Sequence, residues 1–302
     1  MSNNILVLGA GELGTAILEA LANHPQRGDA RITVLLRPTT INSTAPEKKK
    51  QIEQLQALNI ATLPGDVEDP ASTLVELFRK YDTVIGCTGM GCSKGTQLKV
   101  ADCVMEAGVK RFFPWQFGMD FDAVGAGSDQ DKFDDQIKVR QKLRAQDKVD
   151  WIVVSTGLFM TFFFLPDFGV IDLKNRVTRG LGSWDTKMTT TLPRDIGRVT
   201  AELVFNPQGT SNQIVYIAGD TRSYKEISDL VEERFGEGVF KRELWDMETL
   251  KKQVAEGQTF AKYKATFAAG KGVAWDKEKT FNVVRGIEMT DLREYLKQWN
   301  LE

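Results

Sequence analysis

The sequence has 302 residues, of which 42% are hydrophobic, so it is long enough for one large domain or two small ones with a substantial core. Its net charge of −2 and lack of a long basic block argue against nucleic-acid binding, and no apolar run is long enough to span a bilayer. His24 is the only histidine, which excludes a histidine-ligated metal centre and a Ser-His-Asp hydrolase, and the three cysteines fit a reducing cytoplasm.

The first predicted element is an apolar strand that ends at Leu8 and is followed by a glycine-rich turn. Gly9 makes the tight turn, Gly11 lets a pyrophosphate approach the backbone, and Gly14 lets the following helix pack closely on the strand. The N–H groups at the start of that helix, at Glu12 and Leu13, face the phosphates. The pattern predicts the opening βαβ unit of a dinucleotide-binding domain.

The second strand is predicted at residues 31–36 and ends at Arg37. An acidic residue at this strand end accepts from the ribose 2′-OH of NAD, whereas an arginine can hold the 2′-phosphate of NADP. Arg37 therefore favours NADP(H), with Lys48 as a second cation. The alternative interpretation of Arg37 is an ordinary surface charge.

Strands and helices continue to alternate through the first half of the chain, which predicts a Rossmann-type, doubly wound parallel sheet in an α/β protein. The expected helices are 46–58, 70–80 and 95–107, and the expected strands are 60–63, 82–87 and 109–113. Thr88, Gly89 and Met90 follow the fourth strand, at the carboxyl edge of the sheet where ligands bind in this class of fold.

The second half is predicted to contain a helix at 129–146, a strand at 150–155, a helix at 194–205, a strand at 213–217 and a capped helix at 223–235. The aromatic stretch 158–168 either lines a pocket for a flat substrate or packs in the core. We predict a nucleotide-binding domain at residues 1–156, with 190–220 packing back onto it, and a smaller, interlocked substrate domain at 157–302.

Several motifs together resemble the atypical short-chain dehydrogenases of the isoflavone-reductase and NmrA-like group, closest to the fungal isoflavone-reductase-like (CipA-like) branch. The most specific is the run from Lys110 to Pro114 followed by Phe117, Gly118 and Asp120. The other matching segments lie at residues 9–14, 36–37, 65–66, 139–140, 155–159 and 195–197.

The resemblance implies an NADP-binding Rossmann domain with a smaller substrate domain, and reduction of aromatic or phenylpropanoid-type molecules with NADPH. It places further cofactor contacts at Gln116, Phe117, Gly118, Thr156, Gly157 and Phe159. The substrate contacts that we expect are Trp115, Met119, Phe159, Phe162 and Phe163. The expected partner is a small aromatic molecule, and the expected assembly is a monomer or homodimer.

The proton donor is where the sequence departs from the family. Plant members carry a catalytic lysine on the helix after the Phe-Gly-x-Asp loop, and alignment on Phe133 and Arg140 places Gln136 there. A glutamine cannot shuttle a proton at neutral pH. Lys132, one turn earlier on the same helix face, is the alternative acid, although it also fits a solvated charge among aspartates. Gln136 acting through a water, or a substrate hydroxyl, are the other candidates.

The Tyr-x-x-x-Lys dyad of ordinary short-chain dehydrogenases is excluded, because none of the five tyrosines has a lysine four residues later. The leading hypothesis is an NADPH-dependent reductase of a ketone, enone or related aromatic substrate. The alternative is a non-catalytic, NADP(H)-binding redox-sensing regulator of the NmrA type, which the missing lysine keeps open.

Overall fold

The computed structural model describes residues 3–127 and 131–301, without the side chains of Asp131 and Lys132. These residues form two compact units, each built from three segments of the chain. Unit 1 comprises Met1–Gln116, Asp135–Val154 and Ile196–Val215, and unit 2 comprises Phe117–Asp134, Ser155–Asp195 and Tyr216–Glu302.

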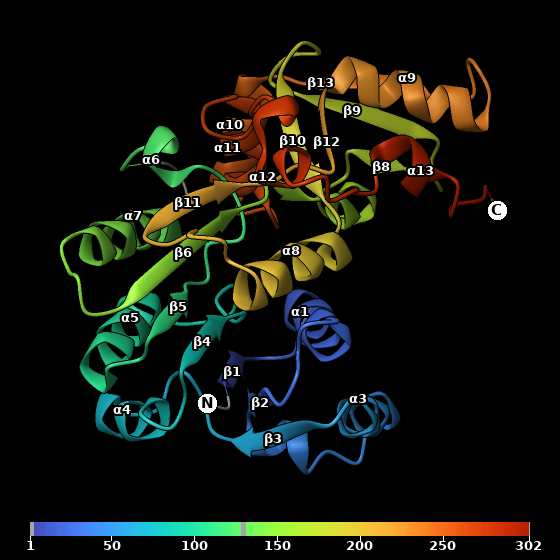
Figure 1. Cartoon of the computed structure of the whole chain (residues 1–302). Helices are drawn as coiled ribbons and strands as arrows, with labels where there is room; N and C mark the ends of the chain where they lie inside the picture. Colours follow the sequence, from blue (N-terminus) through green and yellow to red (C-terminus); the bar gives the residue numbers. More distant parts are fainter. Residues whose placement is uncertain (1–2, 128–130, 302) are drawn as a thin grey trace. The chain divides into compact units, whose positions relative to one another are not determined.

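A seven-stranded sheet forms the centre of unit 1 in the described part of the chain, with the strand order β11-β6-β5-β4-β1-β2-β3 (Figure 1). Its strands are β1 (Asn4–Leu8), β2 (Arg31–Leu36), β3 (Ile60–Pro64), β4 (Thr83–Gly86), β5 (Arg111–Phe113), β6 (Asp150–Ser155) and β11 (Gln213–Tyr216). Neighbouring strands from β3 to β6 pair in parallel. The order runs outward in both directions from β1, which is the doubly wound arrangement that the sequence predicts.

Helices cover both faces of this sheet. They are α1 (Glu12–Asn23), α2 (Pro38–Ile41), α3 (Pro46–Ala57), α4 (Ala71–Phe78), α5 (Thr96–Ala107), α7 (Asp131–Arg144) and α8 (Pro193–Phe205). Figure 1 shows α4, α5 and α7 on one face and α1, α3 and α8 on the other. One hydrophobic core lies under α4, α5 and α7, where residues such as Phe78, Val104 and Leu143 pack against the strands.

A close contact of α8 with α1 explains why residues 196–215 belong to unit 1. A Cβ atom on Gly197 would lie 2.4 Å from the carbonyl oxygen of Ala16, so only glycine allows the two helices to approach this closely. His24 forms the C-cap of α1, its Nε2 lies 3.1 Å from Glu202 on α8, and its ring stacks on Phe205. The single histidine therefore has a structural position at a helix end.

Unit 2 contains two small sheets within the described residues. One has the order β12-β10-β7 and the other β13-β9-β8. Their strands are β7 (Leu158–Phe159), β8 (Ile171–Asp172), β9 (Val177–Leu181), β10 (Lys187–Thr191), β12 (Asp220–Ser223) and β13 (Lys241–Trp245). The helices of this unit are α6 (Phe121–Val124), η1 (Met160–Phe164), α9 (Tyr224–Phe235), α10 (Met247–Ala255), α11 (Ala261–Ala268), η2 (Lys277–Lys279), α12 (Phe281–Val284) and α13 (Leu292–Leu296).

Helix α9 begins with the cap that the sequence predicts. The Ser223 hydroxyl accepts from the Glu226 N–H at 3.2 Å, and the Glu226 carboxylate accepts from the Ser223 N–H at 2.7 Å. This capping box satisfies two N–H groups that the first turn of a helix leaves unpaired. The Ser223 N–H also holds the pKa of Glu226 below its usual value.

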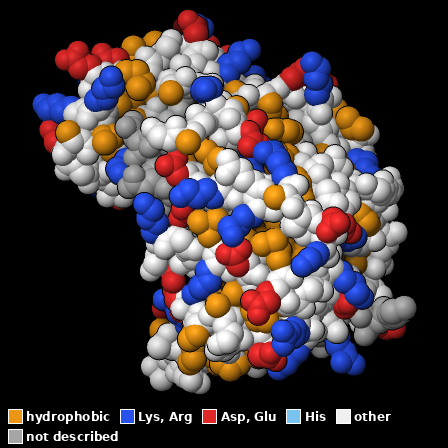
Figure 2. Space-filling model, turned by 90° about the vertical axis from the view of Figure 1, so that its left-hand side faces the viewer, with side chains coloured by type: hydrophobic (Ala, Val, Ile, Leu, Met, Phe, Trp, Pro, Cys, Tyr) orange, Lys and Arg blue, Asp and Glu red, His pale blue; other side chains and the backbone are white. Residues whose placement is uncertain are grey.

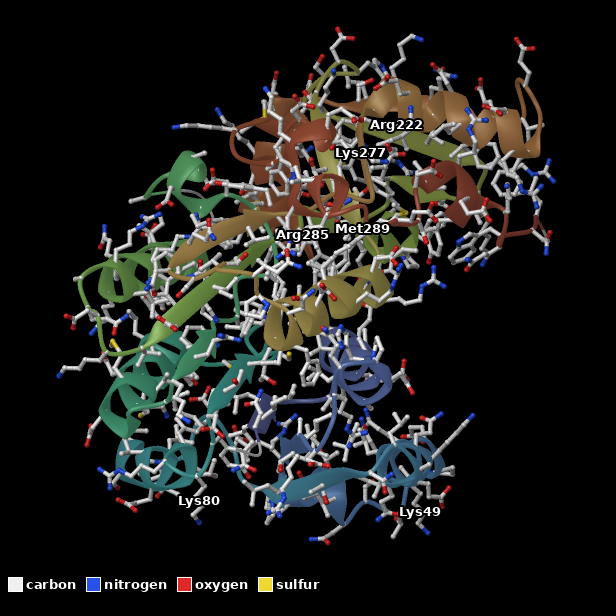
Figure 3. The ribbon with its side chains drawn as sticks, viewed as in Figure 1. Lys49, Lys80, Arg222, Lys277, Arg285 and Met289 are labelled. Atoms are coloured by element: carbon white, nitrogen blue, oxygen red, sulfur yellow. The ribbon has the colours of Figure 1, made fainter. Side chains whose placement is uncertain are left out.

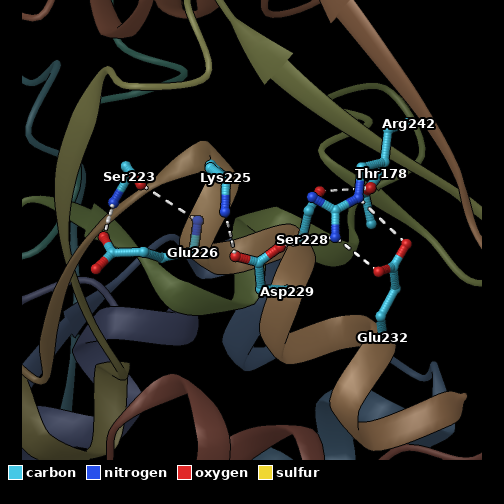
Figure 4. A network of polar contacts seen from close by, with 8 residues as sticks. All are labelled: Thr178, Ser223, Lys225, Glu226, Ser228, Asp229, Glu232 and Arg242. Atoms are coloured by element: carbon cyan, nitrogen blue, oxygen red, sulfur yellow. Dashed lines mark hydrogen bonds and ion pairs between the residues drawn. The ribbon is translucent and has the colours of Figure 1, made fainter. Parts of the chain in front are cut away.

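A polar network joins α9 to the β13-β9 pair (Figure 4). Arg242 on β13 donates to Asp229 and Glu232, both at 2.7 Å, and the Ser228 hydroxyl donates to the Thr178 hydroxyl on β9 at 2.6 Å. The hydrogen bonds to Glu232 hold the pKa of Arg242 above its usual value. Because several partly buried charges share these contacts, the network orients α9 on its sheet.

Lys264 on α11 is a buried cation in unit 2. Its side chain is 2% exposed, and its Nζ lies 4.7 Å from the centre of the Trp245 ring and 3.4 Å from the carbonyl oxygen of Asp167. None of the described carboxylates forms an ion pair with it. Burial, with the nearby charge of Arg179, lowers the pKa of Lys264.

We expect Lys264→Met to raise the free energy of unfolding at neutral pH by about 1–2 kcal/mol, because methionine fills the same space without a buried charge. The lowered pKa also predicts that wild-type stability rises as the pH increases through the interval between the folded-state and unfolded-state pKa values of this lysine. The Met variant lacks this rise. Denaturant unfolding at neutral and alkaline pH measures both effects.

Lys251→Met, on the exposed surface of α10, is the matched control and should change stability by less than about 0.5 kcal/mol. A Lys264→Met variant that is less stable than wild type would show that the lysine is a net stabilising contact.

Positive and negative side chains are mixed on the face that Figure 2 shows. Figure 2 shows lysine and arginine side chains interspersed with aspartate and glutamate over the visible face. None of the described residues form a cluster of metal-ligating side chains. Among the described helices, none has the length and apolar character needed to cross a membrane.

Candidate functional site

The turn after β1 has the backbone that a phosphate-binding glycine turn requires. Gly9 has a φ of +100°, and a Cβ atom there would lie 1.9 Å from the Thr88 hydroxyl. The Gly9 N–H donates to the Leu35 carbonyl at 3.1 Å, and the Thr88 hydroxyl donates to the Leu8 carbonyl at 2.8 Å. These contacts hold the turn between the ends of β1, β2 and β4.

The other two glycines differ in their surroundings. A Cβ atom on Gly14 would lie 2.1 Å from the Gly9 carbonyl oxygen, so α1 is packed directly against the turn, as the sequence predicts. Gly11, the N-cap of α1, makes no side-chain cap and has open space where a Cβ would stand. The helix start therefore lacks an internal side-chain acceptor, and its N–H groups suit an anion. The side chain of Leu13 is buried, so Leu13 can contribute only backbone atoms. Glu12 is exposed.

Gln51 on α3 also contacts this turn, which sequence reasoning missed. Its Nε2 donates to the Ala10 carbonyl at 2.6 Å, and the Thr15 hydroxyl donates to the same oxygen at 3.3 Å. The only signal in the sequence is that Gln51 lies one turn after Lys48 on a predicted helix. Its amide links α3 to the turn and restrains the Ala10 peptide.

We expect Gln51→Leu to weaken the binding of the predicted dinucleotide, NADPH, by about 1 kcal/mol, roughly fivefold, because the turn loses one hydrogen bond that fixes its shape. Titration calorimetry measures the affinity, and thermal unfolding shows whether the fold is intact. Gln54→Leu, at an exposed position of the same helix, is the control. Equal affinities of the Gln51 variant and wild type would exclude this role.

Arg37 lies at the end of β2 with 71% of its side chain exposed. Its described ion pair is a long one, with 4.0 Å between Nε and the Asp66 carboxylate. Such an exposed pair costs little to break, so the guanidinium is available to an anion. Lys48 and its neighbour Lys49 are exposed on α3, and Figure 3 shows Lys49 at the exterior of unit 1.

The loop after β4 is shaped by an aromatic ring. A Cβ atom on Gly89 would lie 2.1 Å from the indole of Trp115, so Trp115 packs against the Gly89 backbone. Gln97 donates to the Thr88 carbonyl at 2.9 Å and fixes the first peptide of the loop. Met90 is 42% exposed. This part of unit 1 thus brings together Thr88 and Gly89, which are predicted cofactor contacts, and Trp115, which is a predicted substrate contact.

Gln116 and Gln136 are brought together in a buried network. Gln116 donates through Nε2 to the main-chain carbonyl of Gln136 at 2.8 Å, and Arg140 donates through Nε to Gln116 Oε1 at 2.8 Å. Gln116 and Gln136 are each 2% exposed, and Arg140 is fully buried. The side chain of Lys132 lies outside the described residues, so its proposed role as an acid stays a prediction.

The predicted contacts in unit 2 share a short parallel bridge. Gly118 pairs with Ser155, and the Gly118 carbonyl accepts from the N–H groups of Thr156 and Gly157 at 2.9 and 3.0 Å. A Cβ atom on Gly157, whose φ is +70°, would lie 2.0 Å from the Thr189 carbonyl oxygen. Phe117 and Met119 adjoin this bridge along the chain and are both buried.

The aromatic residues after β7 form a cluster with later helices. Phe162 makes edge contacts with Phe159 at 6.0 Å and with Phe260 at 5.6 Å between ring centres. Phe159 and Phe162 are half-buried, whereas Phe163 is fully buried. Phe260 and Tyr263, on either side of the start of α11, extend the cluster, and burial raises the pKa of Tyr263. Sequence reasoning missed both, because they lie a hundred residues downstream in a segment without a clear pattern.

The model of the NmrA-like family matches residues 1–296. An "NmrA-like family domain-containing oxidoreductase" of Gibberella moniliformis is 71% identical over 301 residues, covering 100% of this chain and 99% of the relative. Phenylcoumaran benzylic ether reductase Betv6 of Betula pendula is 29% identical, covering 99% and 98%.

Two solved structures show the same fold. A crystal structure of isoflavone reductase superposes with a TM-score of 0.79 at 24% identity, covering 99% of both chains. The structure of AtPrR2 with NADP+ and (+)pinoresinol superposes with a TM-score of 0.78 at 19% identity, also covering 99% of both chains. At these identities the likeness establishes the Rossmann-type fold.

Proposed function

The chain belongs to the NmrA-like family, and we propose that it is an NADPH-dependent oxidoreductase that reduces a small aromatic or phenylpropanoid-like substrate. The observation that carries the proposal is the glycine turn. Gly9 has a positive φ, Gly14 touches the Gly9 carbonyl, and the helix start at Gly11 has no side-chain cap. A Cβ atom at Gly11 would occupy the open space that a pyrophosphate needs, so the residues present fit a dinucleotide.

The preference for NADP(H) is supported by Arg37. Its exposed guanidinium at the end of β2 can donate two parallel hydrogen bonds to a 2′-phosphate, with Lys48 as a second cation. The solved structure of AtPrR2 with NADP+ is consistent with this cofactor. The further cofactor contacts that we propose are Glu12, Leu13, Thr88, Gly89, Met90, Gln116, Phe117, Gly118, Thr156, Gly157 and Phe159.

The aromatic character of the substrate is supported by two observations. The birch relative is named as a benzylic ether reductase, and unit 2 holds the cluster around Phe162. Aromatic side chains bind flat rings through edge and offset contacts. The substrate contacts that we propose are Trp115, Met119, Phe159, Phe162 and Phe163.

Bound NADPH supplies the hydride in such a reaction, and the protein contributes orientation, exclusion of water and a proton. The buried network of Gln116, Gln136 and Arg140 can orient the bound molecules, but it contains no group that donates a proton at neutral pH. The proton comes either from Lys132, from a water held by Gln136, or from a hydroxyl on the substrate. Under this proposal, Lys132→Ala lowers turnover by about 10²–10⁴-fold with unchanged cofactor affinity only if Lys132 is the acid.

The proposal is tested by titrating the protein with NADPH and NADH and then following NADPH oxidation with aromatic ketones and enones. Tight NADPH binding with turnover of any of these compounds supports a reductase. If the protein binds neither NADPH nor NADH, the proposal is wrong, because it rests on dinucleotide binding at the glycine turn.

A redox-sensing regulator without turnover is a second candidate function, favoured by one specific observation. Gln136 cannot transfer a proton at neutral pH. The resemblance to the isoflavone-reductase group places it where plant members carry the catalytic lysine. Binding of NADP(H) without turnover of aromatic carbonyl compounds would favour the regulator.

A further inference from the structure

The side chain of Gln136 has an unsatisfied polar atom in the interior of unit 1. Gln136 is 2% exposed, and its Oε1 is buried without a hydrogen-bond partner among the described residues. A buried acceptor of this kind costs about 1–3 kcal/mol if nothing pairs with it. A leucine would fill a similar volume at no such cost, so stability alone does not explain the amide.

The backbone around Gln136 is held in place. Gln116 donates to the Gln136 main-chain carbonyl, and Arg140 fixes Gln116 by donating to its Oε1, both at 2.8 Å. An arginine offers only donors, so it sets which end of the Gln116 amide carries the oxygen. The same helix buries Val139 and Leu143 in the core. The backbone of Gln136 is therefore held in place, while the Oε1 atom of its side chain has no partner among the described residues.

We propose that Gln136 is a specificity-determining residue whose amide oxygen accepts a hydrogen bond from a neutral donor on the bound ligand. Building on the proposed function, this donor is either a hydroxyl group on the aromatic substrate or the carboxamide N–H2 of the nicotinamide ring. A lysine at this position would offer only donors and a positive charge. The glutamine instead offers a neutral acceptor oxygen beside its N–H2 group and stays uncharged at every pH.

Two matched ligand pairs distinguish the two sources of the donor. The first pair is NADP+ and its 3-acetylpyridine analogue, in which a methyl group replaces the amide N–H2. The second pair is a hydroxyphenyl and a methoxyphenyl ketone of otherwise identical structure, titrated into the NADP+-bound protein. The affinities are measured by calorimetry in wild type, Gln136→Leu and Gln136→Glu.

We expect wild type to favour the donor-bearing member of one pair by about tenfold or more. Gln136→Leu should abolish that preference and unfold at an equal or higher temperature, whereas Gln136→Glu, which keeps an acceptor, should retain it. Gln141→Leu, at an exposed position of α7, is the control and should behave as wild type. The pair that loses its preference identifies the donor.

A Gln136→Leu variant that keeps the wild-type preference in both pairs, or a wild type without preference in either, overturns the proposal. Failure of the proposed function has a different signature, because NADP+ itself then does not bind. The unfolding temperature of Gln136→Leu, measured without ligand, shows in each case whether the fold is intact.

Discussion

Replacing Gly14 by alanine is expected to destabilise unit 1 and to impair cofactor binding together. The new Cβ would lie 2.1 Å from the Gly9 carbonyl oxygen and 2.9 Å from its carbon, which are backbone atoms that cannot swing away. Helix α1 must then move off the turn. We expect a loss of about 1–3 kcal/mol in the free energy of unfolding, as for other overpacked sites.

The affinity for NADPH should fall at least about tenfold in the same variant, because a displaced helix start loses at least one N–H contact to a charged phosphate, worth about 1.5–3 kcal/mol. Gly11→Ala separates the two effects. Its φ of −74° and open surroundings predict unchanged stability, while the added methyl group obstructs the pyrophosphate. If Gly14→Ala binds NADPH and unfolds as the wild-type protein does, the turn tolerates a wider spacing between α1 and Gly9.

Replacing Arg37 by alanine should convert an NADPH-selective protein into one that hardly distinguishes the two dinucleotides. We expect the binding free energy of NADPH to weaken by about 1.5–3 kcal/mol, because a charge-assisted contact to the 2′-phosphate is lost. NADH lacks that phosphate, so its affinity should change little. Calorimetric titration of both cofactors measures the difference.

Arg31→Ala is the control for this variant, since Arg31 is exposed at the opposite end of the same strand. It removes an equal charge from unit 1 and should leave the ratio of the two affinities unchanged. Equal binding of NADPH and NADH by the wild-type protein would remove the argument from Arg37.

The sequence predicts unit 1 well because its elements carry local signals. The strands before Gly9 and Arg37 are apolar runs, and the glycine spacing predicts both the tight turn at Gly9, where φ is +100°, and the close approach of Gly14. Helix α9 is predicted from its cap at Ser223. In each case the residues that form the element also mark its boundaries.

The elements that the sequence does not reveal depend on distant partners. Strand β12 contains Asp220, Thr221, Arg222 and Ser223, a polar run that is extended because it pairs with β10. Phe260 has a φ of +58°, a conformation that a phenylalanine rarely adopts, and it joins an aromatic cluster with residues 159–168. The amide of Gln51 gains its role only when α3 lies beside the glycine turn. Periodicity carries no information on such contacts.

The division of each unit into three segments has a consequence for the order of events during synthesis. The five strand pairs from β3 to β6 in the unit 1 sheet can form once residue 155 is available. Strand β11 and the Gly197 contact with α1 require residues 196–216. Until the ribosome has released them, β6 is an exposed edge strand and the α1 surface beside Ala16 is uncovered. A nascent chain therefore holds an incomplete Rossmann sheet while the intervening segment of unit 2, residues 155–195, is translated.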